Sequence, residues 1–226
     1  MRALVVAAHP DDEVLGCGGT IARLAAEGHR VWVAFLADGV AGRYEKPADV
    51  DPDALRVRHA QWRAAAGDLG VEDVLLCGFP DQRLDTVPLL EVTRALEELI
   101  ARLRPEVVYT HHAGDLNADH AIAHRATLTA TRPVSGCPVR EVYAYEVASA
   151  TEWAFGQAGP AFQPNVFVDI GATLERKLAA LARYRDEARA FPHPRSPEVV
   201  RASAVRWGSV AGVAAAEPFV LVRGLR

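Results

Sequence analysis

Residues 1–19 read MRALVVAAHPDDEVLGCGG and combine a short apolar run, three consecutive acids and a group of glycines. The apolar run over residues 2–8 is typical of a buried β-strand. It is too short, and too close to the acids, for a signal peptide or a membrane span. Apolar residues then recur at helical spacing over residues 14–27, and Gly28 is the expected C-cap. The chain therefore begins with a strand and a helix, joined by the acidic segment.

The same alternation of short apolar runs and helical patterns continues, which predicts an α/β fold with a mostly parallel sheet. Further strands are expected over residues 31–37, 73–79, 106–111, 139–146, 165–170 and 218–223. Helices are expected over residues 53–69, 89–103, 119–130 and 173–190, with one more before the last strand. No low-complexity linker divides the chain, so we expect a single domain over residues 1–226. Its sheet would be Rossmann-like and doubly wound, with helices on both faces and a C-terminal extension.

Composition excludes several classes of protein. The 226 residues carry a formal net charge of −4, which disfavours nucleic-acid binding, because such proteins usually present a basic face. The cysteines Cys17, Cys77 and Cys137 are far apart and form no Cys-x-x-Cys, so no disulfide framework or thiolate zinc site is expected. No stretch approaches the roughly 20 apolar residues of a membrane span. We therefore expect a soluble, cytoplasmic protein.

The first strand ends in His9, Asp11, Asp12 and Glu13, at the sheet edge where open parallel sheets bind ligands. A dinucleotide-binding protein would place a glycine-rich phosphate loop here. Three carboxylates would instead repel phosphate, and the glycines come after them. An imidazole and a carboxylate suit Zn²⁺ or another divalent metal. The residues therefore favour a metal site over a nucleotide site.

A catalytic zinc usually has three protein ligands and one open position. The third ligand must come from another strand end, and the segment DLNADH ends in His120 just after the fourth strand. His111 and His112 are rivals, although strand alternation lets only one of them face a given side. Taken singly, Asp11 or Asp12 would also serve as a helix cap. The joint presence of two His/Asp clusters at one predicted edge is what favours a metal.

AHPDDE together with D-x-N-x-D-H resembles the PIG-L/LmbE-like de-N-acetylases. Weaker family-like segments are GFPDQRLD (78–85), EVASATEW (146–153), PNVFVDI (164–170), PHPRS (192–196) and AEPF (216–219). The resemblance implies a zinc-dependent hydrolase that removes the N-acetyl group from an N-acetylglucosamine-containing substrate, a small amino sugar or glycoconjugate. Family members are often homo-oligomers, but the sequence shows no interface pattern.

Position by position, the resemblance implies that His9, Asp12 and His120 bind zinc, or another divalent metal in its place. Asp11 would be the general base, next to a ligand without being one. Several family members have a histidine where this chain has Asn117, so the role of that imidazole stays open here.

Amide hydrolysis also needs a donor that faces the developing oxyanion. The resemblance implies a histidine from the C-terminal half for this role, and His193, the only histidine after His124, is the candidate. The resemblance further implies that Arg43 reaches the substrate, and Asp85 is a candidate acceptor for sugar hydroxyls. Two alternatives stay open: an amidase that acts on a larger acyl group or a thiol conjugate, and a sugar-binding protein that keeps the metal without turnover.

Overall fold

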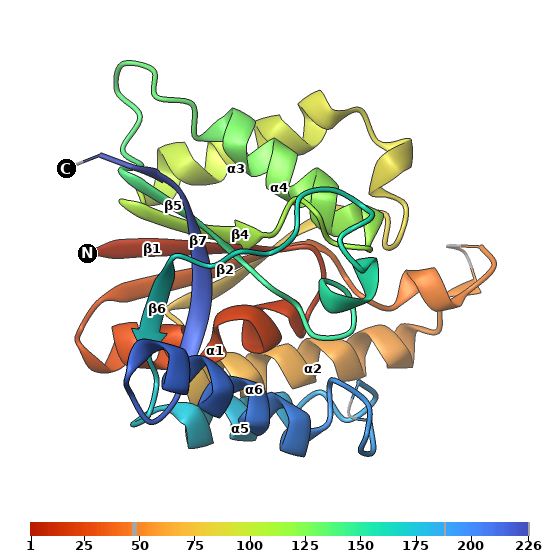
Figure 1. The fold of residues 1–226 in the computed structure, drawn as a ribbon. Helices are drawn as coiled ribbons and strands as arrows, with labels where there is room; N and C mark the ends of the chain where they lie inside the picture. Colours follow the sequence, from red (N-terminus) through yellow and green to blue (C-terminus); the bar gives the residue numbers. More distant parts are fainter. Residues whose placement is uncertain (47–48, 188, 226) are drawn as a thin grey trace.

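The computed structural model describes residues 1–46, 49–187 and 189–225. Its described strands form one sheet of order β3-β2-β1-β4-β5-β7-β6 (Figure 1). The strands are β1 (Arg2–Ala7), β2 (Arg30–Ala37), β3 (Asp73–Phe79), β4 (Val107–His111), β5 (Glu141–Tyr145), β6 (Val166–Asp169) and β7 (Ala216–Gly224). Strands β1 to β5 pair in parallel, whereas β7 is antiparallel to both β5 and β6. The predicted α/β class with a mostly parallel sheet is confirmed.

Helices cover both faces of this sheet. They are α1 (Asp12–Ala26), α2 (Pro52–Leu69), α3 (Leu89–Leu103), α4 (Ala118–Ala130), α5 (Leu174–Leu181) and α6 (Pro197–Ala211). Helices α3 and α4 lie on one face, and α1, α2, α5 and α6 lie on the other (Figure 1). Successive side chains of β1 point to opposite faces of the sheet. Leu4 packs in the core with residues of α3 and α4, whereas Val5 packs in the core with residues of α1. None of the helices in the described ranges is long and apolar enough to cross a membrane.

The predicted long helix over residues 173–190 is wrong, because α5 ends at Leu181. Tertiary contacts of the following residues explain the difference. The Tyr184 hydroxyl donates to Glu13 Oε1 at 2.6 Å, and Arg58 Nη2 donates to Glu187 Oε1 at 2.6 Å. These buried contacts pull the chain out of the helical path. The predicted range also includes residue 188, which lies outside the described residues.

Helix α1 is kinked at Cys17, where φ is −147° and ψ is 23°. Two glycines beside the kink allow the helix to approach its neighbours closely. A Cβ on Gly16 would overlap the Tyr145 ring, and a Cβ on Gly19 would lie 2.8 Å from atoms of Ile170. The glycines after the acidic segment therefore serve helix packing.

A buried ion pair satisfies the backbone groups that the kink exposes. Glu217, on β7, accepts the backbone N–H groups of Gly19 at 2.9 Å and Thr20 at 2.7 Å. Lys177, on α5, donates to the Leu15 carbonyl at 2.9 Å and to Glu217 at 2.6 Å. Helix hydrogen bonds lost at a kink need such partners when they are buried. The C-terminal strand is thereby tied to the helix that carries the acidic segment.

Gly16→Ala is expected to lower the free energy of unfolding by about 1–3 kcal/mol, because a methyl group would overfill the contact with Tyr145. Gly67→Ala is the matched control, since a Cβ there meets nothing within 4 Å on helix α2. The control should be neutral or stabilising by up to about 1 kcal/mol. Equilibrium urea unfolding of both variants measures the difference, and equal stabilities would contradict the packing argument.

Candidate active site

Three side chains predicted as metal ligands lie together at the carboxyl edge of the parallel strands. His9 follows β1, Asp12 begins α1, and His120 lies in the first turn of α4. Each offers one ligand atom, and these atoms all lie within 4.8 Å of one another. Asp12 Oδ2 is 3.4 Å from His9 Nδ1 and 3.3 Å from His120 Nε2. Bonds of about 2.0–2.2 Å in tetrahedral geometry separate ligand atoms by about 3.3–3.6 Å, so the donor set fits a zinc-sized ion.

The charges in this group also suit a cation. Burial lowers the pKa of His9, but hydrogen bonds with Asp119 and Asp12 outweigh it and raise that pKa to about 10. Burial likewise lowers the pKa of His120, and the Asp12 charge raises it to about 9. Burial raises the pKa of Asp12, yet the His120 charge holds it well below its ordinary value. The carboxylates around the two imidazoles therefore favour a positive charge at this point.

Further carboxylates lie behind both imidazoles. Asp119 Oδ2 is 2.9 Å from His9 Nε2, and Asp81 Oδ1 is 3.3 Å from the same nitrogen. Asp115 Oδ2 lies 3.1 Å from His120 Nδ1. Such carboxylates fix the tautomer and the orientation of a metal-binding histidine. No role was predicted for these three aspartates, although Asp115 and Asp119 stand in the second motif.

His9, Asp81 and Asp119 also form a second group whose ligand atoms lie within 4.8 Å of one another. We interpret Asp81 and Asp119 as residues that orient His9 rather than as a second metal site, because His9 Nε2 already forms a hydrogen bond with Asp119.

Asp11 has a strained backbone and a side chain turned away from helix capping. Its φ is 118°, a left-handed value that is rare for any residue except glycine, and its side chain makes no capping hydrogen bond. Oδ2 instead accepts from Arg195 Nη1 at 2.8 Å. Burial raises the pKa of Asp11 and the Arg195 charge lowers it, and the result is about 7. A carboxylate with this pKa can both accept and release a proton near neutrality.

The rival histidines are engaged elsewhere. His111 Nε2 accepts the Ala8 backbone N–H at 2.8 Å, and its ring stacks on His120 with centroids 3.9 Å apart. His112 Nε2 donates to the Pro160 carbonyl at 2.7 Å. The geometry therefore favours His120 over His111, the last residue of β4, and over His112, which follows it.

A hollow of about 160 Å³ opens beside the His/Asp group. Its remaining wall includes Arg43, Gln82, Asn117, Glu187 and Arg195. The Arg43 guanidinium, half exposed, is ion-paired with Glu187. Polar walls of this kind suit a hydroxylated ligand.

Two predicted residues lie outside this wall. Asp85 is exposed in the short 3-10 helix Leu84–Thr86, and it is not among the described residues that line the hollow. His193 packs edge-on against Trp153 with ring centroids 5.4 Å apart, and its Nδ1 accepts the backbone N–H of Arg195 at 3.1 Å. The functional roles of Asp85 and His193 stay predictions.

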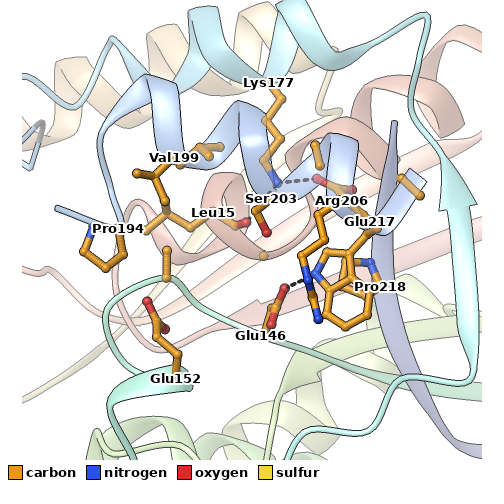
Figure 2. A pocket seen from close by; sticks show the side chains of 16 residues that line it. Leu15, Glu146, Glu152, Lys177, Pro194, Val199, Ser203, Arg206, Glu217 and Pro218 are labelled. Carbon is orange, nitrogen blue, oxygen red and sulfur yellow. Dashed lines mark hydrogen bonds and ion pairs between the residues drawn. The ribbon is translucent and has the colours of Figure 1, made fainter. Parts of the chain in front are cut away.

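A second cavity of about 240 Å³ lies at the same end of the sheet (Figure 2). Trp207 Nε1 donates to Glu146 Oε1 at 2.7 Å on one wall, and Lys177 pairs with Glu217 on another. Pro194 also lines this cavity, whereas the next residue, Arg195, lines the active-site hollow. Consecutive residues of one loop therefore line the two spaces.

Comparisons with known proteins show which family the chain resembles. A model of the family described as PIG-L: GlcNAc-PI de-N-acetylase matches residues 4–131. The uncharacterized deacetylase YaiS of Escherichia coli K12 is 30% identical, with 80% of this chain and 89% of that protein covered. The 1D-myo-inositol 2-acetamido-2-deoxy-alpha-D-glucopyranoside deacetylase 1 of Saccharopolyspora erythraea is also 30% identical, with coverages of 95% and 82%.

Among solved structures, the conserved protein TT1542 from Thermus thermophilus has the same fold. Its TM-score is 0.77 at 30% sequence identity, with 99% of this chain and 96% of that chain covered. The family match spans more than half of the chain and contains all three residues of the His/Asp group. The chain belongs to the PIG-L family of de-N-acetylases.

Proposed function

We propose that the protein is a metal-dependent N-deacetylase that hydrolyses the acetamide of an N-acetylglucosamine-containing small molecule. The main supporting observation is the Asp11 carboxylate, which lines the hollow beside the His/Asp group, is paired with Arg195 and is not part of that group. Relatives support the substrate class, since the Saccharopolyspora erythraea protein is named for a 2-acetamido-2-deoxyglucopyranoside. Cytoplasmic location and homo-oligomer formation stay predictions.

His9, Asp12 and His120 would hold the metal, and their two nitrogens and one carboxylate favour zinc. When bound, zinc supplies a Lewis acid that makes water more acidic and polarises an amide carbonyl. Asp119 and Asp115 hold the two imidazoles in orientation from behind.

Asp11 would move the proton that amide hydrolysis requires. Its carboxylate accepts a proton from the attacking water and then gives it to the nitrogen of the leaving amine. Arg195 binds Oδ2, and none of the described residues donates a hydrogen bond to Oδ1. The Oδ1 atom is therefore the oxygen that would carry the proton.

Arg43 would contact the sugar at the mouth of the hollow, where Gln82 and Asn117 offer further amide groups. The guanidinium can donate hydrogen bonds to sugar hydroxyls, and the two amides can both donate and accept them.

Acetate release from a panel of N-acetylglucosamine compounds tests the function. The panel holds the free sugar, chitobiose and the nucleotide-linked, lipid-linked and thiol-precursor forms. Zinc-loaded protein should release acetate and a free amine from at least one of them, and chelator-treated protein should release none. Release of a longer acid from longer N-acyl analogues alone would support the amidase alternative. Binding without any release would support the sugar-binding alternative.

Asp11→Asn should lower kcat by at least about 100-fold while the bound zinc is retained, because the amide no longer accepts a proton. Steady-state kinetics and elemental analysis measure the two quantities. Asp53→Asn, at an exposed ion pair on α2, is the control and should keep the wild-type kcat. Unchanged turnover in Asp11→Asn would remove Asp11 from the mechanism.

His120→Ala and His9→Ala should each lower the zinc content of the purified protein, since each removes a ligand of the proposed set. His112→Ala is the matched control, because His112 binds the Pro160 carbonyl, and its zinc content should not change. Full occupancy in the His120 variant would mean that the third ligand lies elsewhere.

A further inference from the structure

The Arg195 guanidinium brings a fixed positive charge into the active-site hollow. Nη1 donates to Asp11 Oδ2 at 2.8 Å, and Nε donates to Ser149 Oγ at 2.8 Å and to the Ala148 carbonyl at 3.3 Å. The side chain lines the hollow beside the His/Asp group and also an adjoining one of about 350 Å³ that Gln82 shares. Arg195 therefore contacts the proposed base and, like that base, lines the space open to a ligand.

Local structure on both sides holds Arg195 in this position. Ser196 caps helix α6, where its Oγ accepts the Val199 N–H at 3.3 Å. On the other side, His193 Nδ1 accepts the Arg195 N–H, and the His193 ring packs against Trp153. Both the backbone and the guanidinium are thus fixed before any ligand arrives, which is the condition for electrostatic preorganisation.

The charge and the donors of Arg195 match the needs of the reaction. When water attacks an amide, the carbonyl oxygen gains negative charge and must be stabilised. An arginine is always protonated and carries five N–H groups in a planar fork. Nε and Nη1 are occupied, whereas Nη2 has no hydrogen-bond partner among the described residues.

We propose that Arg195 is a catalytic residue whose Nη1 orients Asp11 and whose Nη2 donates to the developing oxyanion. This inference rests on the proposed deacetylase function. As the water oxygen bonds to the carbonyl carbon, Asp11 takes the water proton and the C=O electron pair moves to the oxygen beside Nη2. The pair then returns, the C–N bond breaks, and Asp11 protonates the amine. Arg195 neither gains nor loses a proton.

Kinetics of Arg195→Met test the proposal against the role predicted for His193. We expect kcat to fall about 100-fold or more, with a KM within a few-fold and unchanged zinc content. Arg195→Lys should recover only part of the loss, because a lysine lacks the planar fork. Arg176→Met is the control: this half-buried arginine binds the Asp68 carbonyl, and its loss should leave kcat unchanged. A large loss in His193→Ala without one in Arg195→Met would overturn the proposal.

Binding of a phosphonamidate analogue provides a readout that does not need turnover. The analogue replaces the acetyl carbonyl by a tetrahedral phosphorus with an anionic oxygen, so it mimics the state that Nη2 would stabilise. Calorimetry on zinc-loaded protein should show the Arg195→Met variant losing affinity by about the factor lost in kcat/KM. Unchanged affinity would refute the oxyanion role. A wild-type protein that binds the analogue but hydrolyses no compound would refute the proposed function alone.

Discussion

The active site depends on the contacts that the Asp12 carboxylate makes with the groups around it. Its Oδ2 accepts the His9 backbone N–H at 2.9 Å and also lies within 3.5 Å of an imidazole nitrogen of His9, His111 and His120. These groups come from the ends of β1 and β4 and from the start of α4. One oxygen atom therefore fixes the relative positions of three elements that are distant in the chain. Burying so many polar groups in one place would be costly if they did not pair with one another.

Much of the fold follows from local signals. β3 and α3 have the ranges that their patterns predict, because an apolar run and an amphipathic repeat each end at clear turn residues. The prediction of a helix over residues 173–190 is wrong because contacts with distant parts of the chain, rather than local signals, decide where this helix ends. Its amphipathic pattern is real, but the buried partners of Tyr184 and Glu187 act over more than a hundred residues of sequence. Such contacts override a local preference.

The active site likewise contains residues that could be predicted from the sequence and one that could not. His9, Asp12 and His120 stand in compact motifs at strand ends, so their convergence could be predicted from the sequence, with His111 and His112 as the rivals of His120. The proposed role of Arg195 could not be predicted in this way, because it depends on a contact with Asp11, which lies 184 positions earlier in the chain. The segment PHPRS drew attention to its histidine, although the arginine two residues later is the one that reaches the hollow. Side-chain direction in an irregular loop has no periodicity from which to predict it.

The C-terminal part is more than an extension of the family core. The family match ends at residue 131, yet Glu217 holds the kinked helix α1, and Arg195 holds Asp11. The later segments thus support the geometry of motifs that they do not contain. A protein with the same first half and a different second half would keep the ligand set and present another surface to the reacting amide.

The left-handed backbone of Asp11 has a consequence for evolution and engineering. It turns two successive carboxylates in different directions, so that Asp12 faces the imidazoles while Asp11 faces the guanidinium. Glycine would adopt this conformation without strain. Selection for thermal stability alone would thus favour replacing Asp11 by glycine. Screens for more stable variants would therefore tend to enrich variants without catalytic activity.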